Sequence, residues 1–170
     1  MRRLRIMRRE RRLRRVLRMA EIQNIFLCFV HRFPMKEAEE AEAIENKGLR
    51  GCIHGRTGSK RQVLLMDIET LEKFDLAPGV TKENLTVRGL DFSTLEVGQQ
   101  LRAGDATFEI SLRCDPCPRM DEIREGLEEA LRGQRGWLCR VVKPGKIRKG
   151  DRIEVIEKKS VEPAETLATA

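Results

Sequence analysis

The sequence predicts a mainly β domain with a few helices (α+β), arranged as a β-barrel-like sheet. Short segments rich in Ile, Val, Leu and Phe recur along the chain, separated by the turns Gly104-Asp105, Pro144-Gly145 and Gly150-Asp151. Only two or three segments show helical periodicity. Because the chain has six Phe, one Trp and no Tyr, its core must be built mainly from aliphatic side chains. Short strands joined by tight turns, with few helices, are typical of small barrel-like domains.

The expected strands are runs of β-branched and aliphatic residues bounded by glycine, proline or polar residues. They cover residues 21–32, 62–66, 86–87, 99–102, 106–112, 136–142 and 152–157. Residues 34–47 are acidic and rich in alanine, and we expect a short helix or a flexible loop there. A short helix is also expected after Asp67, which has the position of an N-cap.

Residues 121–133 show the clearest helical pattern of the chain. Asp121 is the expected N-cap and Gly133 the expected end of this helix. Its apolar face consists of Ile123, Leu127, Ala130 and Leu131. Gly126 costs about 1 kcal/mol relative to alanine inside a helix, which indicates a close approach to a neighbouring strand or a ligand.

Charge is distributed unevenly and divides the chain into three parts. Residues 1–19 contain ten arginines and one acid, Glu10, and carry +9, so the other residues carry −2 of the total of +7. We therefore expect an Arg-rich leader at 1–19, one domain at 20–157 and a disordered tail at 158–170. The composition changes abruptly after Met19. We therefore interpret the leader as a disordered segment, or as the product of an upstream start codon with the natural start at Met19. The alternatives are an anchor for an anionic surface and an RNA-binding arm.

The compartment and the partners follow from the cysteines and the hydropathy. The chain has five cysteines, an odd number, and the apolar run at residues 25–30 is far too short for a signal sequence or a membrane span. We expect free thiols in the cytoplasm and no membrane span. The near-neutral domain has few aromatic rings for stacking on bases, so we expect no nucleic-acid binding by it.

The most informative stretch for function is residues 113–121, between an expected strand and the expected helix. Pro116 and Pro118 lack backbone N–H donors and favour extended conformations in the residues before them. Cys117 is therefore expected in a stiff turn just before a helix, where neighbouring amides and cations stabilise a thiolate. Nucleophilic chemistry and metal binding both need the thiolate. The alternative is a structural turn in which both cysteines are small apolar side chains.

Two further segments carry polar residues that could contact a ligand. Residues 48–55 contain three glycines and predict a turn-rich loop whose backbone comes close to another group. Glu83 and Asn84 stand at the entrance of an expected strand, where they could bind a ligand or cap the loop. The cations that flank the glycine loop, and that could bind an anion or remain solvated, are Arg56, Lys60 and Arg61.

Five segments, taken in order, resemble the MOSC domain, the module named for the C-terminal part of molybdenum cofactor sulfurases. They read GLRGCIH at 48–54, QVLLM at 62–66, PGVTKEN at 78–84, Pro116-Cys117 with the following helix, and GKIRKGD at 145–151. The resemblance covers about residues 20–157. Each segment alone is weak, and their order and spacing make the resemblance fairly specific.

The resemblance implies a mainly β, barrel-like fold and a functional cysteine at Cys117. In similar proteins that bind the molybdenum cofactor, such as the mitochondrial amidoxime reducing component, the corresponding thiolate ligates molybdenum. In the sulfurase context the domain receives or passes sulfur as a persulfide, from a partner that uses pyridoxal phosphate. Arg113 and Arg119 would supply positive charge near Cys117 and could grip a pterin phosphate. The other candidate cofactor-binding residues are Glu83, Asn84 and His54.

The chain departs from the family pattern at Gly51-Cys52, where the glycine-rich loop commonly reads Gly-Asp. Cys52 could be a second, resolving thiol, which would favour sulfur transfer over metal ligation. No flavin, haem or iron–sulfur motif is present, so an oxidoreductase of this sequence would need a separate redox partner. A sulfur carrier would need a sulfur donor such as a cysteine desulfurase. We predict a protein that handles sulfur or the molybdenum cofactor through Cys117, as persulfide carrier or as molybdenum ligand.

A third hypothesis is a small zinc-binding or basic-arm interaction protein without catalysis. Cys114 and Cys117 have the spacing of a zinc half-site, as do Cys28 and His31. In a strand, however, residues three apart point to opposite faces, so Cys28 fits a core position better. The ligands that could complete such a site are Cys28, His31, Cys52, His54 and Cys139.

Overall fold

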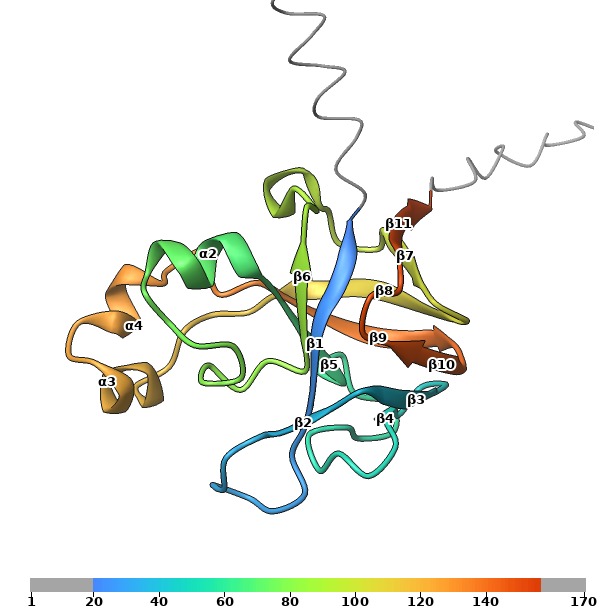
Figure 1. The fold of residues 1–170 in the computed structure, drawn as a ribbon, viewed down its shortest axis with the longest axis horizontal. Helices are drawn as coiled ribbons and strands as arrows, with labels where there is room; N and C mark the ends of the chain where they lie inside the picture. The colour runs from blue at the N-terminus through green and yellow to red at the C-terminus, as the bar shows by residue number, and fades with distance from the viewer. Residues whose placement is uncertain (1–19, 157–170) are drawn as a thin grey trace, which may run out of the picture.

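The computed structural model describes residues 20–156; the predicted leader at 1–19 and tail at 158–170 lie outside the described residues. The fold is mainly β with a few short helices, which confirms the predicted class. The strands form one eight-stranded sheet and one three-stranded sheet (Figure 1). None of the helices in the described range is both long and apolar enough to cross a membrane.

The eight-stranded sheet has the order β11-β7-β8-β9-β5-β6-β1-β2. Its strands are β1 (Glu21–Leu27), β2 (Lys36–Ala38), β5 (Val63–Asp67), β6 (Leu85–Arg88), β7 (Gln100–Ala103), β8 (Ala106–Arg113), β9 (Trp137–Lys143) and β11 (Ile153–Ile156). Every neighbouring pair is antiparallel except β5 and β6, which run parallel. A crossover through the helix α2 (Ile68–Lys73) joins these two strands.

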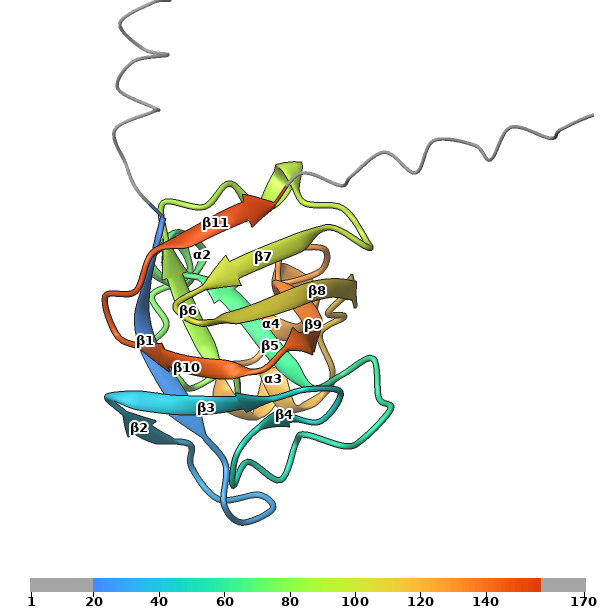
Figure 2. The same ribbon diagram turned by 90° about the vertical axis from the view of Figure 1, so that its right-hand side faces the viewer.

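The sheet curls strongly, as the barrel-like expectation requires, but it is not closed into a complete barrel (Figure 2). The edge of β1 that faces away from β6 contacts two segments, β2 and the residues before β11. Its second half pairs with β2, while its start meets the residues before β11, where the Ile22 N–H donates to Asp151 O at 2.9 Å. The contact continues through a single bridge between Glu21 and Arg152. One bridge is too short to extend the ladder around the sheet.

The smaller sheet has the order β10-β3-β4, with β3 (Glu40–Ile44), β4 (Gly48–Leu49) and β10 (Gly145–Arg148). The prediction of a helix or loop at 34–47 was therefore wrong, because this segment contains β2 and β3. Ala41 and Ala43 are buried on one face of β3, while the glutamates alternate with them on the other face. This alternation gives a strand of period two, and pairing with β10 completes it.

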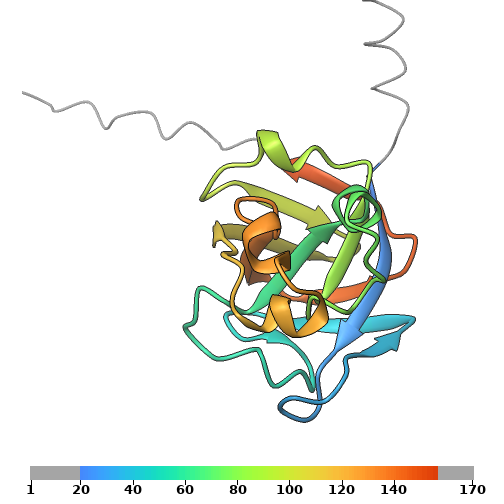
Figure 3. The ribbon, with the colours of Figure 1, turned by 90° about the vertical axis from the view of Figure 1, so that its left-hand side faces the viewer.

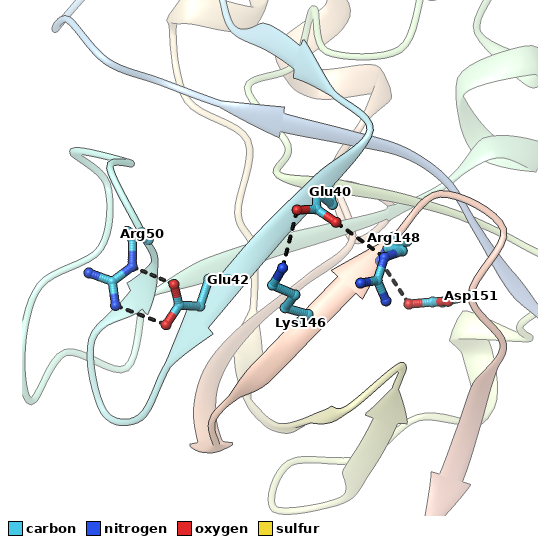
Figure 4. Close-up of polar contacts among 6 residues, drawn as sticks. All are labelled: Glu40, Glu42, Arg50, Lys146, Arg148 and Asp151. Atoms are coloured by element: carbon cyan, nitrogen blue, oxygen red, sulfur yellow. Dashed lines mark hydrogen bonds and ion pairs between the residues drawn. The ribbon is translucent and has the colours of Figure 1, made fainter.

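Ion pairs on the outer face of this sheet explain its acidic composition (Figure 4). Glu40 lies between two cations of β10, with distances of 3.4 Å to Lys146 Nζ and 3.1 Å to Arg148 Nε. Glu42 forms a pair of bonds with the Arg50 guanidinium, the shorter of which is 2.6 Å. These pairs are exposed, so water and dissolved salt screen them and they add little stability. They favour one register of β3 against β10 more than they add stability.

The helices lie together on one side of the sheet (Figure 3). The prediction of an N-cap at Asp67 is confirmed, since the Thr70 N–H donates to its carboxylate at 3.0 Å. The single helix predicted at 121–133 is instead two, α3 (Arg119–Ile123) and α4 (Leu127–Ala130). They are separated because Gly126 has a φ of 80°, which a continuous helix excludes. Asp121 caps the second helix, accepting from the Glu128 N–H at 2.7 Å.

Most of the other predicted strands are confirmed with small shifts at their ends. The strand expected at 21–32 stops at Leu27, and the chain then turns through residues 28–35. The turn expected at Pro144-Gly145 leads directly into β10. At the foot of the molecule in Figure 1, the loop between β1 and β2 lies beside the loop that follows β4. The start of β1 and the end of β11 lie at the opposite end.

Candidate functional site

Cys117 lines a pocket of about 380 Å³, which we call the Cys117 pocket. Its walls come from the loop after β4, the start of β6, the turn after β8 and the segment that leads into β9. These segments are far apart in sequence and meet because β9 lies between β8 and β5 in the sheet. The pocket therefore exists only in the complete fold.

The turn that carries Cys117 is fixed at both ends by backbone hydrogen bonds. The Cys114 N–H donates to Gly136 O at 3.0 Å, which ties the end of β8 to the start of β9. The Met120 N–H donates to Cys117 O at 2.8 Å as α3 begins after Pro118. The Cys117 side chain remains half-buried, so it is held in place and is still accessible from the pocket.

The two cysteines of the turn have different surroundings. Cys114 is only 5% exposed and packs with Leu64 and Leu138 in a small apolar cluster under the turn. Burial raises the pKa of the Cys114 thiol, although the charge of Arg135 opposes the shift. Both cysteines line the pocket, but Cys114 is buried and behaves as a neutral packing residue, while Cys117 is the more exposed thiol.

The pocket is strongly cationic. Among the described residues that line it, none carries a carboxylate. Its cations are Arg56, Arg61, Lys82, Arg119 and Arg135. In contrast, arginines elsewhere on the domain, such as Arg88 and Arg140, are paired with glutamates. Cations gathered without acids make the pocket a site for an anion.

Arg135 contacts Cys117 directly. Its Nη1 atom is 3.9 Å from Cys117 Sγ and donates to Asp115 O at 3.0 Å, while its Nη2 donates to Thr81 O at 3.1 Å. The side chain is only 9% exposed, and its Nε atom is buried without a hydrogen-bond partner in the described part of the chain. A buried guanidinium that keeps an unpaired N–H donor beside a thiol can donate a hydrogen bond to a bound anion.

Arg135 is a site residue that the sequence patterns did not predict. It lies between Gly133 and Gly136, immediately before a buried strand. An arginine between two glycines at the start of such a strand indicates a side chain held close to the backbone of other segments. That signal is present in the sequence, but it is weak without the fold.

A family model described as the MOSC domain matches residues 56–154. The chain belongs to the MOSC domain family. Membership agrees with the resemblance found in the sequence and supports a general role connected with the molybdenum cofactor. No curated protein sequence matches the chain.

Solved structures share the MOSC fold at low sequence identity. The YuaD protein from Bacillus subtilis has a TM-score of 0.71 and 20% identity, covering 81% of this chain and 95% of that one. YiiM from Geobacillus stearothermophilus has a TM-score of 0.64 and 17% identity, covering 84% and 77%. YiiM from Escherichia coli has a TM-score of 0.60 and 20% identity, covering 81% and 70%. At these identities the likeness shows the fold alone.

The MOSC fold brings some of the predicted site residues together. His54, Asn84 and Arg119 line the same pocket as Cys117. Glu83 does not line it: this side chain is fully buried and accepts from the Gly79 N–H and from Thr81 Oγ1. These bonds hold the turn at residues 78–82, which carries Lys82 into the pocket, so Glu83 contributes to the site indirectly.

Arg113 does not line the Cys117 pocket. Its guanidinium lies 4.1 Å from the centre of the Trp137 ring and donates to Gly133 O at 2.8 Å. It faces a different pocket, which also contains Asp67 and Glu69. Arg113 is the last residue of β8, and consecutive side chains of a strand point to opposite faces of the sheet. Its side chain can therefore lie on a different face from the residues of the turn that follows.

The structure gives no support to a zinc site. Within residues 20–156, no three His, Cys, Asp or Glu side chains form a group that could hold a metal ion. Cys28 and Cys139 are core residues, and His31 is exposed. A single thiolate ligand at Cys117 requires no such group.

Cys52 lies behind the pocket wall that His54 and Asn84 form. Asn84 Nδ2 donates to Cys52 Sγ at 3.4 Å, and the same amide bonds Phe26 O and the Leu64 N–H. Burial raises the pKa of the Cys52 thiol, but hydrogen bonds with His54 outweigh it and lower the pKa to about 7.

This pKa predicts a pH-dependent stability. The ordinary value of 9.0 applies to the unfolded chain, so between about pH 7 and pH 9 the unfolded state binds more protons than the folded state. Stability should therefore rise over this interval, by roughly 2 kcal/mol in full, and be lost as pH falls through 7. To test this prediction, the free energy of unfolding of wild type and of Cys52→Ser is measured with urea at pH 6.5 and at pH 9. The difference between the two proteins should be larger at pH 9. An unchanged difference would show that the thiol does not ionise.

Proposed function

We propose that this MOSC protein handles sulfur or the molybdenum cofactor through Cys117, with the thiolate as molybdenum ligand. The observation that carries the proposal is the arrangement of a half-buried thiol in a pocket with five cations and no carboxylate. A bound pterin cofactor brings phosphate and dithiolene groups, and both are anionic. The pocket has the charge that such a molecule requires.

The residues present fit the cofactor, judged by their donors. The unpartnered Nε of Arg135 is a buried donor that a phosphate or thiolate group could satisfy. Within residues 20–156, the side chains of Arg56, Arg61 and Arg119 form no ion pair or hydrogen bond with another residue. An unpaired guanidinium group suits a phosphate, because its two parallel N–H donors match two phosphate oxygens.

Each residue has a separate task in this proposal. Cys117 supplies the sulfur ligand, and Arg135 holds the Asp115–Cys117 turn and offsets negative charge at the sulfur. Arg119 and Lys82 bind the anionic groups of the cofactor. Asn84 holds the backbones of β5 and β1 in place through its hydrogen bonds with the Leu64 N–H and Phe26 O. The cofactor, when bound, supplies oxygen-atom or sulfur transfer at molybdenum.

A persulfide carrier is the second candidate, and the short distance between Arg135 and Cys117 favours it equally. A guanidinium at 3.9 Å from Sγ stabilises a persulfide anion as well as a thiolate. The other cations decide between the two, because a single terminal sulfur does not need a pocket of this size lined by four more positive charges. The partner is then a redox protein, whereas a carrier would depend on a cysteine desulfurase.

The test is a native intact mass of the full chain, purified without reductant from a host that makes the molybdenum cofactor. We expect an adduct with the mass of a molybdopterin, lost in Cys117→Ser. A mass raised by one sulfur atom on Cys117 would instead establish the carrier. A bare polypeptide, or an adduct that persists in Cys117→Ser, would contradict both forms of the proposal.

Cys114→Ala is the matched control for this measurement. Cys114 lines the same pocket and packs in the apolar cluster, so alanine there removes a thiol while keeping Cys117 and the five cations. The adduct should be retained in Cys114→Ala. Loss in both variants with a folded far-ultraviolet spectrum would show that the turn, and not the thiol of Cys117, binds the cofactor.

A further inference from the structure

A groove of about 530 Å³ adjoins the Cys117 pocket and belongs to none of the roles assigned so far. We call it the Met35 groove. It lies between the turn after β1, the turn at residues 78–82 and the helix α3. Lys82, Arg119 and Met120 line both the groove and the Cys117 pocket, so the two spaces share a wall.

The floor of the Met35 groove is apolar. Phe26 and Met120 are buried beneath it, and Met35, Val80 and Ile123 are half-buried along its sides. Half-buried aliphatic side chains around a recess leave apolar surface in contact with water. Covering that surface with a ligand is favourable by about 25 cal/mol per Å².

The rim of the groove is cationic. Arg32, Lys82 and Arg119 line it, and Glu122 is the one acid among the described lining residues. Arg32 and Arg119 form no side-chain hydrogen bond or ion pair with another residue of 20–156. Lys82 Nζ donates one bond, to Phe33 O at 3.0 Å, which leaves two of its three donors free.

Four arginines of the described chain lack any such side-chain partner, and each lines the Met35 groove, the adjoining Cys117 pocket or both. They are Arg32, Arg56, Arg61 and Arg119. Arginines elsewhere pair with glutamates or with backbone carbonyls. The unpaired arginines of the described residues are therefore concentrated at two adjoining recesses.

We propose that the Met35 groove binds a small molecule with an apolar body and a carboxylate or phosphate group. The apolar body covers Met35 and Val80, and the anionic group meets Lys82 and Arg119 at the wall shared with Cys117. A volume of about 530 Å³ is within the range of about 300–1,000 Å³ that is common for small-molecule sites. The groove shares Lys82 and Arg119 with the proposed cofactor site, whereas Arg32, Met35, Val80 and Ile123 line the groove alone.

Methionine methyl signals give a direct test on the full-length protein. With ¹³C-methyl methionine, we would titrate benzoate and phenyl phosphate and record the signals of Met35, Met120 and Met66. Met35 lines the groove and not the Cys117 pocket. Met66 is fully buried in the apolar cluster that includes Leu71 and Leu127 and lines neither space, so Met66 serves as an internal control. Met35 and Met120 should shift in a saturable manner, and Met66 should remain unchanged. Assignment follows from Met35→Leu.

Matched probes separate the two halves of the proposal. Benzamide has the apolar body without the charge, and inorganic phosphate has the charge without the body; both should bind at least tenfold more weakly. Equal binding of benzamide and benzoate would overturn the role of the cations. Equal effects of inorganic phosphate and phenyl phosphate on Met35 would overturn the role of the apolar floor. Shifts of Met120 without Met35 would place the ligand in the Cys117 pocket and overturn the proposal.

Variants connect the binding to named side chains. Lys82→Gln and Arg119→Gln should each weaken phenyl phosphate binding about tenfold, because each removes one charge-assisted contact. Arg132→Gln is the control, since Arg132 is exposed and paired with Glu129 on α4. Unchanged affinity in both groove variants would contradict the proposal. Because no molybdenum is needed, a negative result here leaves the test of Cys117 unaffected.

Discussion

Gly136→Ala is expected to cause the largest loss of stability of any single substitution near the site. A Cβ atom at Gly136 would overlap the carbonyl oxygen of Leu65, which is backbone of the adjacent strand β5. Backbone cannot move aside as a flexible side chain can, so β9 must separate from β5. We expect a decrease of about 3–5 kcal/mol in the free energy of unfolding, measured with urea.

Gly133→Ala is the matched control for this prediction. Gly133 also has a positive φ, of 71°, but no atom outside its immediate chain neighbours lies within 4 Å of the position that a Cβ would take. The alanine therefore costs only the strain of the left-handed backbone, about 1 kcal/mol. Equal losses in the two variants would show that backbone conformation, and not contact with Leu65, limits position 136.

Arg135→Met is expected to abolish cofactor binding and to lower stability as well. Methionine keeps much of the apolar stem, but it removes the donors to Thr81 O and Asp115 O and the positive charge beside Cys117. The two carbonyls then lack their donors, at a cost of roughly 2 kcal/mol in the free energy of unfolding. Molybdenum content per chain after expression with the cofactor, measured by mass spectrometry of the metal, should fall at least tenfold.

Arg135→Lys separates charge from geometry. A lysine keeps the positive charge, but its single nitrogen cannot reach two carbonyls in the fixed arrangement of a guanidinium. We expect stability between those of wild type and Arg135→Met, with molybdenum content still reduced. Wild-type molybdenum content in Arg135→Met, in a protein that remains folded, would contradict the role assigned to this residue.

Local patterns predicted most of the strands and the Cys117 turn. The strand at 62–66 and the cap at Asp67 depend on neighbouring residues, and both are confirmed. The strand β3 could not be predicted, because it pairs with β10 and its Glu40 pairs with Lys146, 106 positions further along the chain. Tertiary pairing replaced a helical composition with a strand.

The candidate site was predictable only where its residues carry their own signal. The Pro116-Cys117 turn stands out in the sequence by itself, whereas Arg135 acquires meaning from the proximity of Thr81 and Asp115. Arg113 illustrates the converse. It is close to Cys117 in sequence, but the direction of its side chain at the end of β8 sends it to Trp137. Sequence distance indicates which residues can meet, and the register of the strand decides which do.

The central position of β9 has a consequence for synthesis of the protein. Apart from the bridge between Glu21 and Arg152, one side of the large sheet (β11, β7 and β8) and the other (β5, β6, β1 and β2) are joined in the described chain by β9, residues Trp137–Lys143. While the ribosome is still adding those residues, the edge of β5 is open and the apolar side chains of Val63–Asp67 have no cover on that side. The nascent chain is therefore most vulnerable to aggregation just before β9 emerges. The pocket at Cys117 is likewise incomplete until then, because Arg135 and Leu138 are the last of its lining residues to be synthesised.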